Sequence, residues 1–599
     1  MTRNIYLVGF LAALAFPGIL ASQDLSQAAR KPGDPGGAAN EPPAAGPAPP
    51  VIQSVEQLYA VTNLIKVELF MEEAAWDQVR YSWRGDEPQL VDGRWVIVRS
   101  DYEHQRANVV INGVRCDNVG VRKKGFLGSL SAQRPALKLK FDNYVKEQAY
   151  LGLRELTLNN NLTDPAQIRQ QLAYEWFRRA GLAAPRCNLA RVYLNGKFLG
   201  VYSNVEPIGS GFLSDRFGTS AGQLYESTRL DFQPGAVERF EAKAGMPAAD
   251  RSSLRELARL LEDVPAADVA ALAGVVDLDQ FLKYWVTEMM LGLKDGYAGN
   301  RNNFFVHQHP ETGLLQFLPW GTDGAFAHFN PTIAESAPKL IQAKGRLCAA
   351  LYSHPVWRQR YLDLVAKQLA DWWDETALLM AVNRATALVR PHVHLPGREF
   401  DQAIAHLKDY IRSVAPQIEA ELRTPPAKWL VTLPEYVPPV QSVPPSWAGS
   451  MQSNFLLPFG RFDPSRPTLL KTDALRFVWR GEPVKYPLVG GTAGYASPNP
   501  AWFDDVRLWL ATQEPASGRT VWFSFSIDRE LLARERRLKL HRSQVMAWSG
   551  IIEAGRPGFL ALGNLLGTLE VALVEIDGVP HLRGAIAAWL ISDRGAVEF

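Results

Sequence analysis

The densest run of polar residues in this 599-residue chain follows an apolar segment that ends at Leu293. It spans Lys294–Asn303 (KDGYAGNRNN) and precedes a short apolar stretch. A second polar segment, Pro319–Phe326 (PWGTDGAF), follows the next pair of apolar stretches. Catalytic groups often gather on loops at the ends of regular elements. The sequence therefore predicts that Asp295, a neighbouring asparagine and Asp323 meet across one β-hairpin.

This residue set suits transfer of a phosphoryl group from ATP. The reaction uses hard oxygen ligands for Mg²⁺ or Mn²⁺, a carboxylate near the attacking hydroxyl, and cations on the phosphates. Asp295, Asn303 and Asp323 can meet the first two requirements. Lys138 and Lys140 are candidates for the third, because strand alternation puts both on one face of 136–141 (ALKLKF).

The elements that must position these residues are strands and helices in mixed order. Alternating and helical patterns predict strands at 64–69, 95–98, 109–111, 118–123, 136–141, 189–194, 198–205, 303–306 and 315–318, and helices at 164–181, 253–261, 278–293, 347–388 and 400–423. Asn-Gly pairs at 112–113 and 195–196 predict tight hairpins. This order, with a glycine-containing loop before the strand lysines, is also that of a protein kinase.

Several of these segments resemble the CotH family, the secreted atypical kinases similar to spore coat protein H. The resemblance lies in Val121–Gly125 with 138–141, the 164–181 helix with Arg169, Val192–Tyr202 leading to Glu206, and the two polar segments above. It covers about residues 60–420. It implies an α+β, protein-kinase-like fold with a mixed β-rich N-lobe and a mainly helical C-lobe, which uses ATP and magnesium to phosphorylate protein hydroxyls.

The resemblance also implies a role for each candidate residue. Asp295 is the catalytic-loop aspartate, Asn303 the metal-binding asparagine and Asp323 the metal-binding aspartate of the Asp-Gly turn. The residues expected to hold the nucleotide are Lys124, Lys138, Lys140 and Glu175, with Glu175 paired to Lys138 or Lys140.

Three features depart from the family pattern. The loop from Gly125 reads Gly-Phe-Leu-Gly-Ser where the family usually has Gly-Asn-Ser-Ser, and Trp320–Asp323 has one carboxylate where the family often has Trp-Asp-x-Asp. Asn300 has the protein-kinase spacing from Asp295, whereas Asn303 directly precedes the strand.

The leading interpretation is a secreted kinase that transfers the γ-phosphate of ATP to Ser or Thr of an exported protein. The main alternative is a catalytically weak or inactive kinase-like protein that binds or assembles in the cell envelope. A metal-dependent hydrolase could use the same carboxylates. In a purely structural interpretation, Asp295 and the asparagines only bond within a turn, and Lys138 and Lys140 lie on a solvated strand.

Composition argues against other classes. The chain has 64 Lys+Arg against 62 Asp+Glu, a net charge of +2, and no dense basic block, so a nucleic-acid partner is not expected. Its three cysteines are widely spaced without a CxxC pair, which excludes a thiolate zinc site and leaves room for at most one disulfide.

The chain ends predict the location and the domains. Residues 1–22 have the charged, apolar and small-residue order of a signal peptide, and 23–50 form a Pro/Ala/Gly-rich linker. A kinase-like domain is predicted at 51–425, a Pro-rich connector at 426–449 and a mostly-β domain at 450–599. We expect a secreted, periplasmic or cell-surface protein with no membrane span in the mature chain; a retained N-terminal anchor is the alternative.

Overall fold

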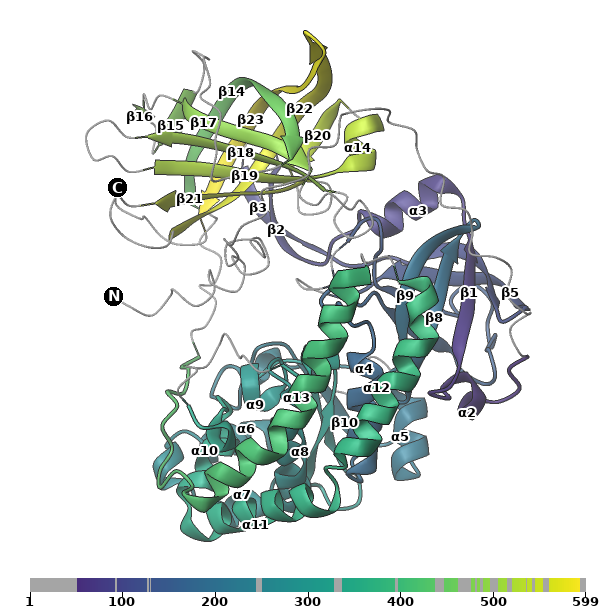
Figure 1. The fold of residues 1–599 in the computed structure, drawn as a ribbon. Coiled ribbons are helices and arrows are strands. Elements are labelled where there is room, and N and C mark those ends of the chain that lie inside the picture. Colours follow the sequence, from purple (N-terminus) through teal and green to yellow (C-terminus); the bar gives the residue numbers. More distant parts are fainter. Residues whose placement is uncertain are drawn as a thin grey trace. The chain divides into compact units, whose positions relative to one another are not determined.

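In the computed structural model the chain forms two compact units (Figure 1). The structure describes residues 51–91, 94–125, 129, 131–243, 250–327, 337–393, 397–436, 446–461, 476–479, 482–484, 488–495, 505–513, 520–534, 536–540, 545–552 and 560–592. The predicted signal peptide and linker lie outside these residues, as does 437–445 of the predicted connector. The larger unit takes in the described parts of 37–76 and 104–438; the smaller takes in those of 77–103 and 439–599.

The larger unit begins with a closed β-barrel. Around the barrel the order is β1-β4-β5-β6-β7-β9-β8; β1 and β8 pair in parallel, and the other neighbours pair antiparallel. Its strands are β1 (Leu64–Phe70), β4 (Gln105–Ile111), β5 (Val114–Lys123), β6 (Leu137–Lys140), β7 (Glu155–Asn159), β8 (Cys187–Leu194) and β9 (Lys197–Val205). Leu137 and Leu139 of β6 are fully buried, whereas Lys138 and Lys140 are half-buried, as the alternation predicts.

Both predicted Asn-Gly hairpins are confirmed. Asn112 and Gly113 join β4 to β5 with φ of 45° and 86°, and Asn195 and Gly196 join β8 to β9 with φ of 47° and 85°. Two successive residues with positive φ match the twist of the flanking strands, and asparagine and glycine tolerate this conformation.

The helix predicted from Asp164 begins five residues later, as α4 (Arg169–Arg179). Gln167 has a φ of 60°, so the backbone is left-handed just before the helix. The buried Asp164 carboxylate instead accepts the N–H groups of Ala166 at 2.9 Å and Arg169 at 2.8 Å. Asp164 therefore holds the bend that leads into α4.

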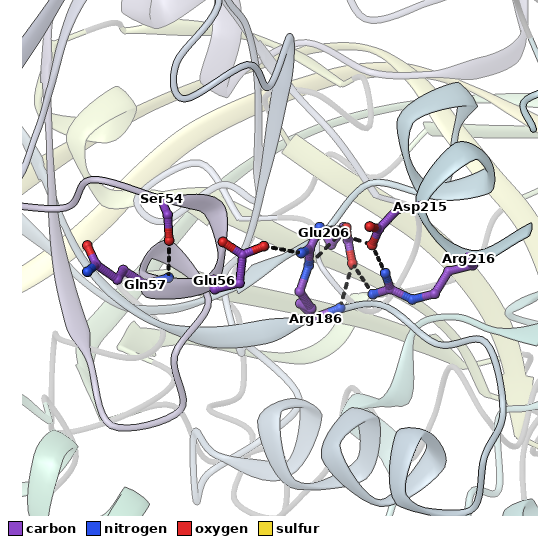
Figure 2. A network of polar contacts seen from close by, with 7 residues as sticks. All are labelled: Ser54, Glu56, Gln57, Arg186, Glu206, Asp215 and Arg216. Atoms are coloured by element: carbon purple, nitrogen blue, oxygen red, sulfur yellow. Dashed lines mark hydrogen bonds and ion pairs between the residues drawn. The ribbon is translucent and has the colours of Figure 1, made fainter. Parts of the chain in front are cut away.

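Glu206, which follows β9, joins three parts of this unit (Figure 2). Its nearly buried carboxylate accepts the backbone N–H of Arg186 at 2.8 Å and Nη2 of Arg216 at 3.0 Å. The Arg186 guanidinium also donates to Glu206, and its Nη1 lies 3.5 Å from Glu56. The network ties the start of β8 to α2 (Val55–Leu58) and α5 (Ser210–Phe217).

Helices and one small sheet complete the larger unit. The sheet has the order β11-β10-β12-β13, formed by β10 (Gln223–Ser227), β11 (Glu241–Ala242), β12 (Phe304–Gln308) and β13 (Leu315–Pro319). The helices are α6 (Ser252–Leu260), α7 (Val269–Ala273), α8 (Leu278–Met290), α9 (Tyr297–Asn300), α10 (Arg346–Ser353), α11 (Pro355–Asp371), α12 (Glu375–Val389) and α13 (Gly397–Arg423). In Figure 1, α12 and α13 run side by side.

The segment predicted to be helical at 347–388 forms three helices, α10, α11 and α12. His354 is extended, with φ of −85° and ψ of 120°, and Pro355 starts α11. Asp374 caps α12 by accepting the N–H of Ala377 at 2.8 Å. Proline in a first turn and an aspartate N-cap are local start signals inside a continuous apolar pattern.

The smaller unit is mostly β, as predicted. Its sheet runs β16-β15-β14-β17-β18-β19-β21-β22-β20, and β23 pairs with β14 and β22. The strands are β14 (Ser446–Arg461), β15 (Arg476–Trp479), β16 (Glu482–Val484), β17 (Leu488–Tyr495), β18 (Asp505–Gln513), β19 (Thr520–Asp528), β20 (Arg537–Leu540), β21 (Val545–Ile552), β22 (Leu560–Ile576) and β23 (Val579–Ser592), with one helix, α14 (Arg529–Arg534). The α+β class with a C-terminal mostly-β region is thus confirmed.

The smaller unit also contains a segment predicted to lie in the kinase-like domain. This is 77–103, which holds the end of α3 (Glu73–Arg80) and the hairpin of β2 (Gly85–Val91) and β3 (Arg94–Ser100). Tyr81 packs against the apolar core of the C-terminal sheet. The segment 77–103, which lies inside the predicted domain at 51–425, is therefore part of the smaller unit.

The cysteines and the helix lengths of the described residues bear on two of the predictions. Cys116, Cys187 and Cys348 are free thiols. Among the described helices, none is both long enough and apolar enough to cross a membrane.

Candidate active site

Asp295 lies at the centre of a group of asparagines between α8 and β12. Its Oδ1 accepts Nδ2 of Asn300 at 2.6 Å, and its Oδ2 accepts Nδ2 of Asn302 at 3.1 Å and of Asn303 at 2.8 Å. Both candidate asparagine registers therefore contact Asp295, so the sequence spacing alone could not choose between them. The three amides therefore hold the Asp295 carboxylate in one orientation.

Burial raises the pKa of Asp295, although the hydrogen bond from Asn300 opposes the shift. The nearby charge of Asp323 raises this pKa further, while Asn302 and the guanidinium of Arg229 lower it. Asp323 is thus close enough for the two carboxylates to interact. A carboxylate with a raised pKa is a better proton acceptor than an exposed one.

Glu288 of α8 holds this loop through hydrogen bonds, and it was not among the predicted site residues. Its buried carboxylate accepts the hydroxyl of Tyr284 at 2.6 Å and the backbone N–H groups of Tyr297 at 3.1 Å and Ala298 at 2.8 Å. Burial raises the pKa of Glu288 to about 7. The signal in the sequence is a lone carboxylate within the apolar 278–293 run, which would need buried partners.

Asp323 lies in a short 3₁₀ turn, Thr322–Gly324, directly after β13. One carboxylate oxygen accepts the hydroxyl of Thr163, from the bend before α4. A Cβ at Gly324 would lie 3.7 Å from the Cβ of Asp295 and 3.6 Å from the side chain of Lys294. The turn after β13 and the loop after α8 therefore pack against each other, as the sequence predicted.

Lys124 is the predicted lysine whose contacts lead toward this group. Its ammonium donates to Oδ1 of Asn159 and lies 5.5 Å from the ring centre of Trp320, three residues before Asp323. Burial lowers the pKa of Lys124 to about 8, against the opposing charges of Glu226 and Asp323. The partly desolvated ammonium of Lys124, near Glu226 and Asp323, is a group that could bind a phosphate.

Lys138 and Lys140 lie differently. Nζ of Lys138 forms an ion pair with Glu155 at 2.7 Å, and both side chains are about a quarter to a third exposed. Lys140 shares the same half-buried face of β6. Among the three predicted lysines, the described contacts therefore connect Lys124 with Asp323 and occupy Lys138 elsewhere on the barrel.

Part of the chain is similar to a known protein family. A family model described as CotH kinase protein matches residues 121–415. Residues 121–415 therefore form a CotH domain. Lys124, Glu175, Asp295, Asn303 and Asp323 all lie within the matched region.

Three curated relatives illustrate the range of CotH proteins. The chain is 24% identical over 246 residues to the inner spore coat protein H of Bacillus subtilis, covering 38% of this chain and 65% of that protein. It is 24% identical over 180 residues to invasin CotH3 of Rhizopus delemar (27% of this chain, 30% of the relative) and 23% identical over 195 residues to invasin CotH7 of the same organism (31% and 32%). The chain therefore spans less than two thirds of the length of each of these relatives.

The lysine–glutamate pair expected from the CotH resemblance is wrong for Glu175. Its Oε1 accepts Nη2 of Arg179 at 2.8 Å, and its Oε2 accepts Nη2 of Arg384 of α12 at 3.1 Å. Glu175 therefore joins α4 to α12. The helical pattern correctly indicated a charge that needs partners but could not say which residues supply them.

A polar relay connects α4 with Lys124 instead. Asn159 accepts from Lys124 and donates through Nδ2 to Oε1 of Gln170 at 2.7 Å. Gln170, on the first turn of α4, donates in turn to Oδ1 of Asn161 at 3.1 Å. Neutral amides thus hold the Lys124 ammonium in place, and no carboxylate on α4 is needed for this.

Two further cations beside the CotH site were not among the predicted ligands. Arg169 donates through Nη1 to the carbonyl of Ala325 at 3.2 Å and forms a 3.3 Å ion pair with Asp164. Burial lowers the pKa of Lys294, as does the charge of Arg169, while Asp295 and Asp323 raise it. Arg169, Lys294 and Lys124 thus bring positive charge around Asp323.

The CotH site contains oxygen ligands of the kind that a hard divalent cation prefers. Asp295 and Asp323 are like charges close to each other, a repulsion that a cation would relieve, and Asn303 offers a carboxamide oxygen. Within the described ranges, no group of three or more His, Cys, Asp or Glu side chains is arranged for a metal. The fit therefore rests on two carboxylates and an amide.

Proposed function

We propose that the CotH domain is an ATP-dependent kinase that phosphorylates Ser or Thr of an exported protein. The observation that carries the proposal is the packing of the turn with Asp323 against the loop with Asp295, close to the half-buried ammonium of Lys124 over Trp320. Phosphoryl transfer is mainly positioning and charge neutralisation, and this set of groups can do both.

Each residue has a role in this proposal. Asp295, held by three amides, orients the acceptor hydroxyl and takes its proton. Lys124 contacts the nucleotide phosphates, while Asn303 and Asp323 would hold the metal. Mg²⁺ or Mn²⁺ supplies charge neutralisation on the phosphates when it is bound with ATP. Thr163 fixes one oxygen of Asp323, so that this carboxylate presents the other.

The surroundings of the site are part of the proposal. The predicted signal peptide would export the chain, and the named relatives include a spore coat protein and invasins. We infer that the protein acts at the cell surface, in the periplasm or outside the cell, on another exported protein.

A catalytically weak or inactive binding protein is the second candidate, and Gly321 favours it. This glycine stands where the family often has the first carboxylate of Trp-Asp-x-Asp, so the site has fewer oxygen ligands. In that case the CotH domain would bind nucleotide or partner without turnover.

Transfer of labelled γ-phosphate separates the two candidates. The purified chain is incubated with Mg²⁺, labelled ATP and an envelope extract, beside Asp295→Asn, Asp323→Ala and the surface control Asp117→Asn. We expect labelling by the wild type and by the control, and a loss of at least about a hundredfold in the two site variants. Mg²⁺-dependent ATP binding without any labelled product would favour the binding protein, and free phosphate without a labelled acceptor would indicate a hydrolase.

A further inference from the structure

Lys294 directly precedes Asp295, and two glycines pack against it. A Cβ at Gly299 would lie 2.3 Å from the backbone oxygen of Lys294, so the loop can approach this closely only with a glycine there. A Cβ at Gly324 would lie 3.6 Å from both Cγ and Cε of Lys294, so the aliphatic stem of the lysine runs along the Asp-Gly turn. The proposed function gives Lys294 no role.

The backbone keeps the Lys294 segment beside this turn. The N–H of Phe326 donates to the carbonyl of Leu291 at 2.6 Å, so the residues after Asp323 run alongside the segment that leads to Lys294. The Cβ position of Gly324 is also 3.7 Å from Cβ of Asp295, almost as close as it is to the lysine stem. Packing therefore places the Lys294 side chain between the loop with Asp295 and the turn with Asp323.

The ammonium of Lys294 differs from the neighbouring cations because it has no direct partner. Arg169 donates to the carbonyl of Ala325, and Lys124 donates to Asn159. Among the residues that the structure describes, none accepts a hydrogen bond from the Lys294 ammonium or lies within ion-pair distance of it. The side chain is nevertheless half-buried, and burial lowers its pKa. A partly desolvated ammonium without a bonded partner costs free energy that a bound anion offsets.

The charges near Lys294 keep it protonated without occupying its donors. The guanidinium of Arg169 lowers the pKa of Lys294, whereas Asp295 and Asp323 raise it. Both oxygens of Asp295 already accept amide hydrogens, and one oxygen of Asp323 accepts the hydroxyl of Thr163. The three N–H donors of the Lys294 ammonium are therefore available to a ligand at this site.

We propose that Lys294 is a catalytic residue that binds the phosphoryl group being transferred from ATP. This inference rests on the proposed kinase function, because it takes Asp295 as the residue that receives the acceptor hydroxyl. Lys294 adjoins Asp295, whereas Lys124 lies over Trp320, three residues before Asp323. The two lysines thus serve different phosphates, and Lys294 serves the one next to the acceptor.

The transfer step gives Lys294 a defined task. The acceptor oxygen bonds to the γ-phosphorus, the bond from this phosphorus to the bridging oxygen breaks, and its electron pair leaves with ADP. The proton of the acceptor goes to Asp295, while Lys294 keeps its own protons and donates hydrogen bonds to the non-bridging γ-oxygens. A compact ammonium with three donors suits this role, because those oxygens carry the charge of the transition state.

Nucleotide binding tests the inference without requiring turnover. Calorimetric titrations of the full chain compare Mg²⁺-ATP with Mg²⁺-ADP, because only ATP carries the γ-phosphate. We expect Lys294→Met to weaken ATP binding about tenfold and to change ADP binding by less than about twofold. Lys124→Met should weaken the binding of both nucleotides. Lys294→Arg keeps the positive charge and should keep most of the ATP affinity.

The matched control is Lys367→Met, which removes a lysine of α11 that is 72% exposed and should leave both affinities unchanged. Equal weakening of ATP and ADP binding by Lys294→Met would overturn the inference, because the lysine would then bind a phosphate that both nucleotides share. Unchanged binding of both would overturn it as well.

Transfer of labelled phosphate separates this inference from the kinase function. Labelling by the wild type that Lys294→Met leaves unchanged would contradict a role for Lys294 and leave the kinase function standing. Selective loss of ATP binding in Lys294→Met, together with no labelled product from the wild type, would support the role of Lys294 and count against the kinase function.

Discussion

Gly321 lies against the carboxamide of Asn303, so closely that a Cβ at position 321 would come within 2.6 Å of Asn303 Cγ. The backbone of Gly321 is also left-handed, with a φ of 52°. Asn303 donates to Asp295 from the same carboxamide. The absence of a side chain at Gly321 thus leaves room for the asparagine that bonds to the proposed catalytic residue.

The first prediction follows from this contact. Gly321→Ala should lower the free energy of unfolding by roughly 1–3 kcal/mol, because it combines a left-handed alanine with a clash. It should also displace Asn303 and weaken Mg²⁺-dependent ATP binding. Urea denaturation and a thermal shift with Mg²⁺ and ATP measure the two effects.

Gly313→Ala is the matched control for Gly321→Ala. Gly313 has a φ of 72°, and a Cβ there would meet nothing within 4 Å, so the variant carries the backbone cost alone. Equal loss of stability and equal ATP binding in both variants would contradict a special role for the Asn303 contact.

The second prediction concerns which lysine serves the nucleotide. Lys124→Met should weaken ATP binding about tenfold, because it removes a half-buried cation that lies over Trp320 and interacts with Asp323. Lys138→Met should change it by less than about twofold, since Lys138 pairs with Glu155. Calorimetric titration of Mg²⁺-ATP decides between them, and the reverse order of effects would return the role to Lys138.

The pKa of Lys124, about 8, gives a third prediction. Lys124 is protonated below that pH and loses its charge above it, so ATP affinity of the wild type should fall as pH rises from about 7 to about 9. Lys124→Arg keeps a cation throughout this range and should flatten the profile. A wild-type profile that stays flat between these pH values would show that Lys124 does not contribute its charge to binding.

A fourth prediction uses the buried Glu288, whose pKa is raised from 4.5 to about 7. The folded state holds a proton at Glu288 that the unfolded chain has already lost between these pH values. The stability contributed by Glu288 is therefore fully present below 4.5 and is lost as pH rises through 7, by an amount on the order of 3 kcal/mol.

Denaturation of Glu288→Gln across pH 4.5 to 8 tests the sign. The free energy of unfolding of the wild type, minus that of the variant, should decrease as pH rises. Glu311→Gln, in the exposed turn after β12, should leave the slope of the wild type unchanged. An increase of the difference with pH would mean that the ionised Glu288 is the form that the fold prefers.

Local patterns in the sequence were enough for much of the fold and part of the site. The Asn-Gly pairs at 112–113 and 195–196 predicted the turns, because both residue types tolerate positive φ. The alternation of 136–141 correctly predicted that Leu137 and Leu139 are buried. Asp295 and Asp323 were expected to meet because a short hairpin separates them. Each of these inferences uses neighbours in the chain.

Inferences that depend on distant partners were less complete. Alternation puts Lys138 and Lys140 on one face, but closure of the barrel decides that Lys138 meets Glu155. The partners of Glu175 are Arg179, one turn along the same helix, and Arg384, which lies 209 residues away. Arg229 and Lys344 reach the Asp295 loop through backbone bonds that no side-chain pattern reveals.

The last prediction concerns the segment 77–103, which no sequence pattern separates from its neighbours. The Arg80 side chain, 5% exposed, lies 2.7 Å from Asp77 and 2.6 Å from Glu530. Tyr81 packs on the apolar core of the C-terminal sheet. A fragment of 439–599 fused to 77–103 by a flexible linker should therefore unfold at a higher urea concentration than 439–599 alone.

Arg80→Met in the fused fragment should remove about 1–2 kcal/mol of its stability, because it breaks the ion pairs with Asp77 and with the partly exposed Glu530. A fusion that carries a scrambled 77–103 sequence controls for the added length and should behave as 439–599 alone does. Equal midpoints for the native and scrambled fusions would show that 77–103 does not stabilise the sheet. A higher midpoint that Arg80→Met lowers would establish that the C-terminal unit is built from two separate stretches of chain, and that removing it at residue 438 leaves 77–103 without its core.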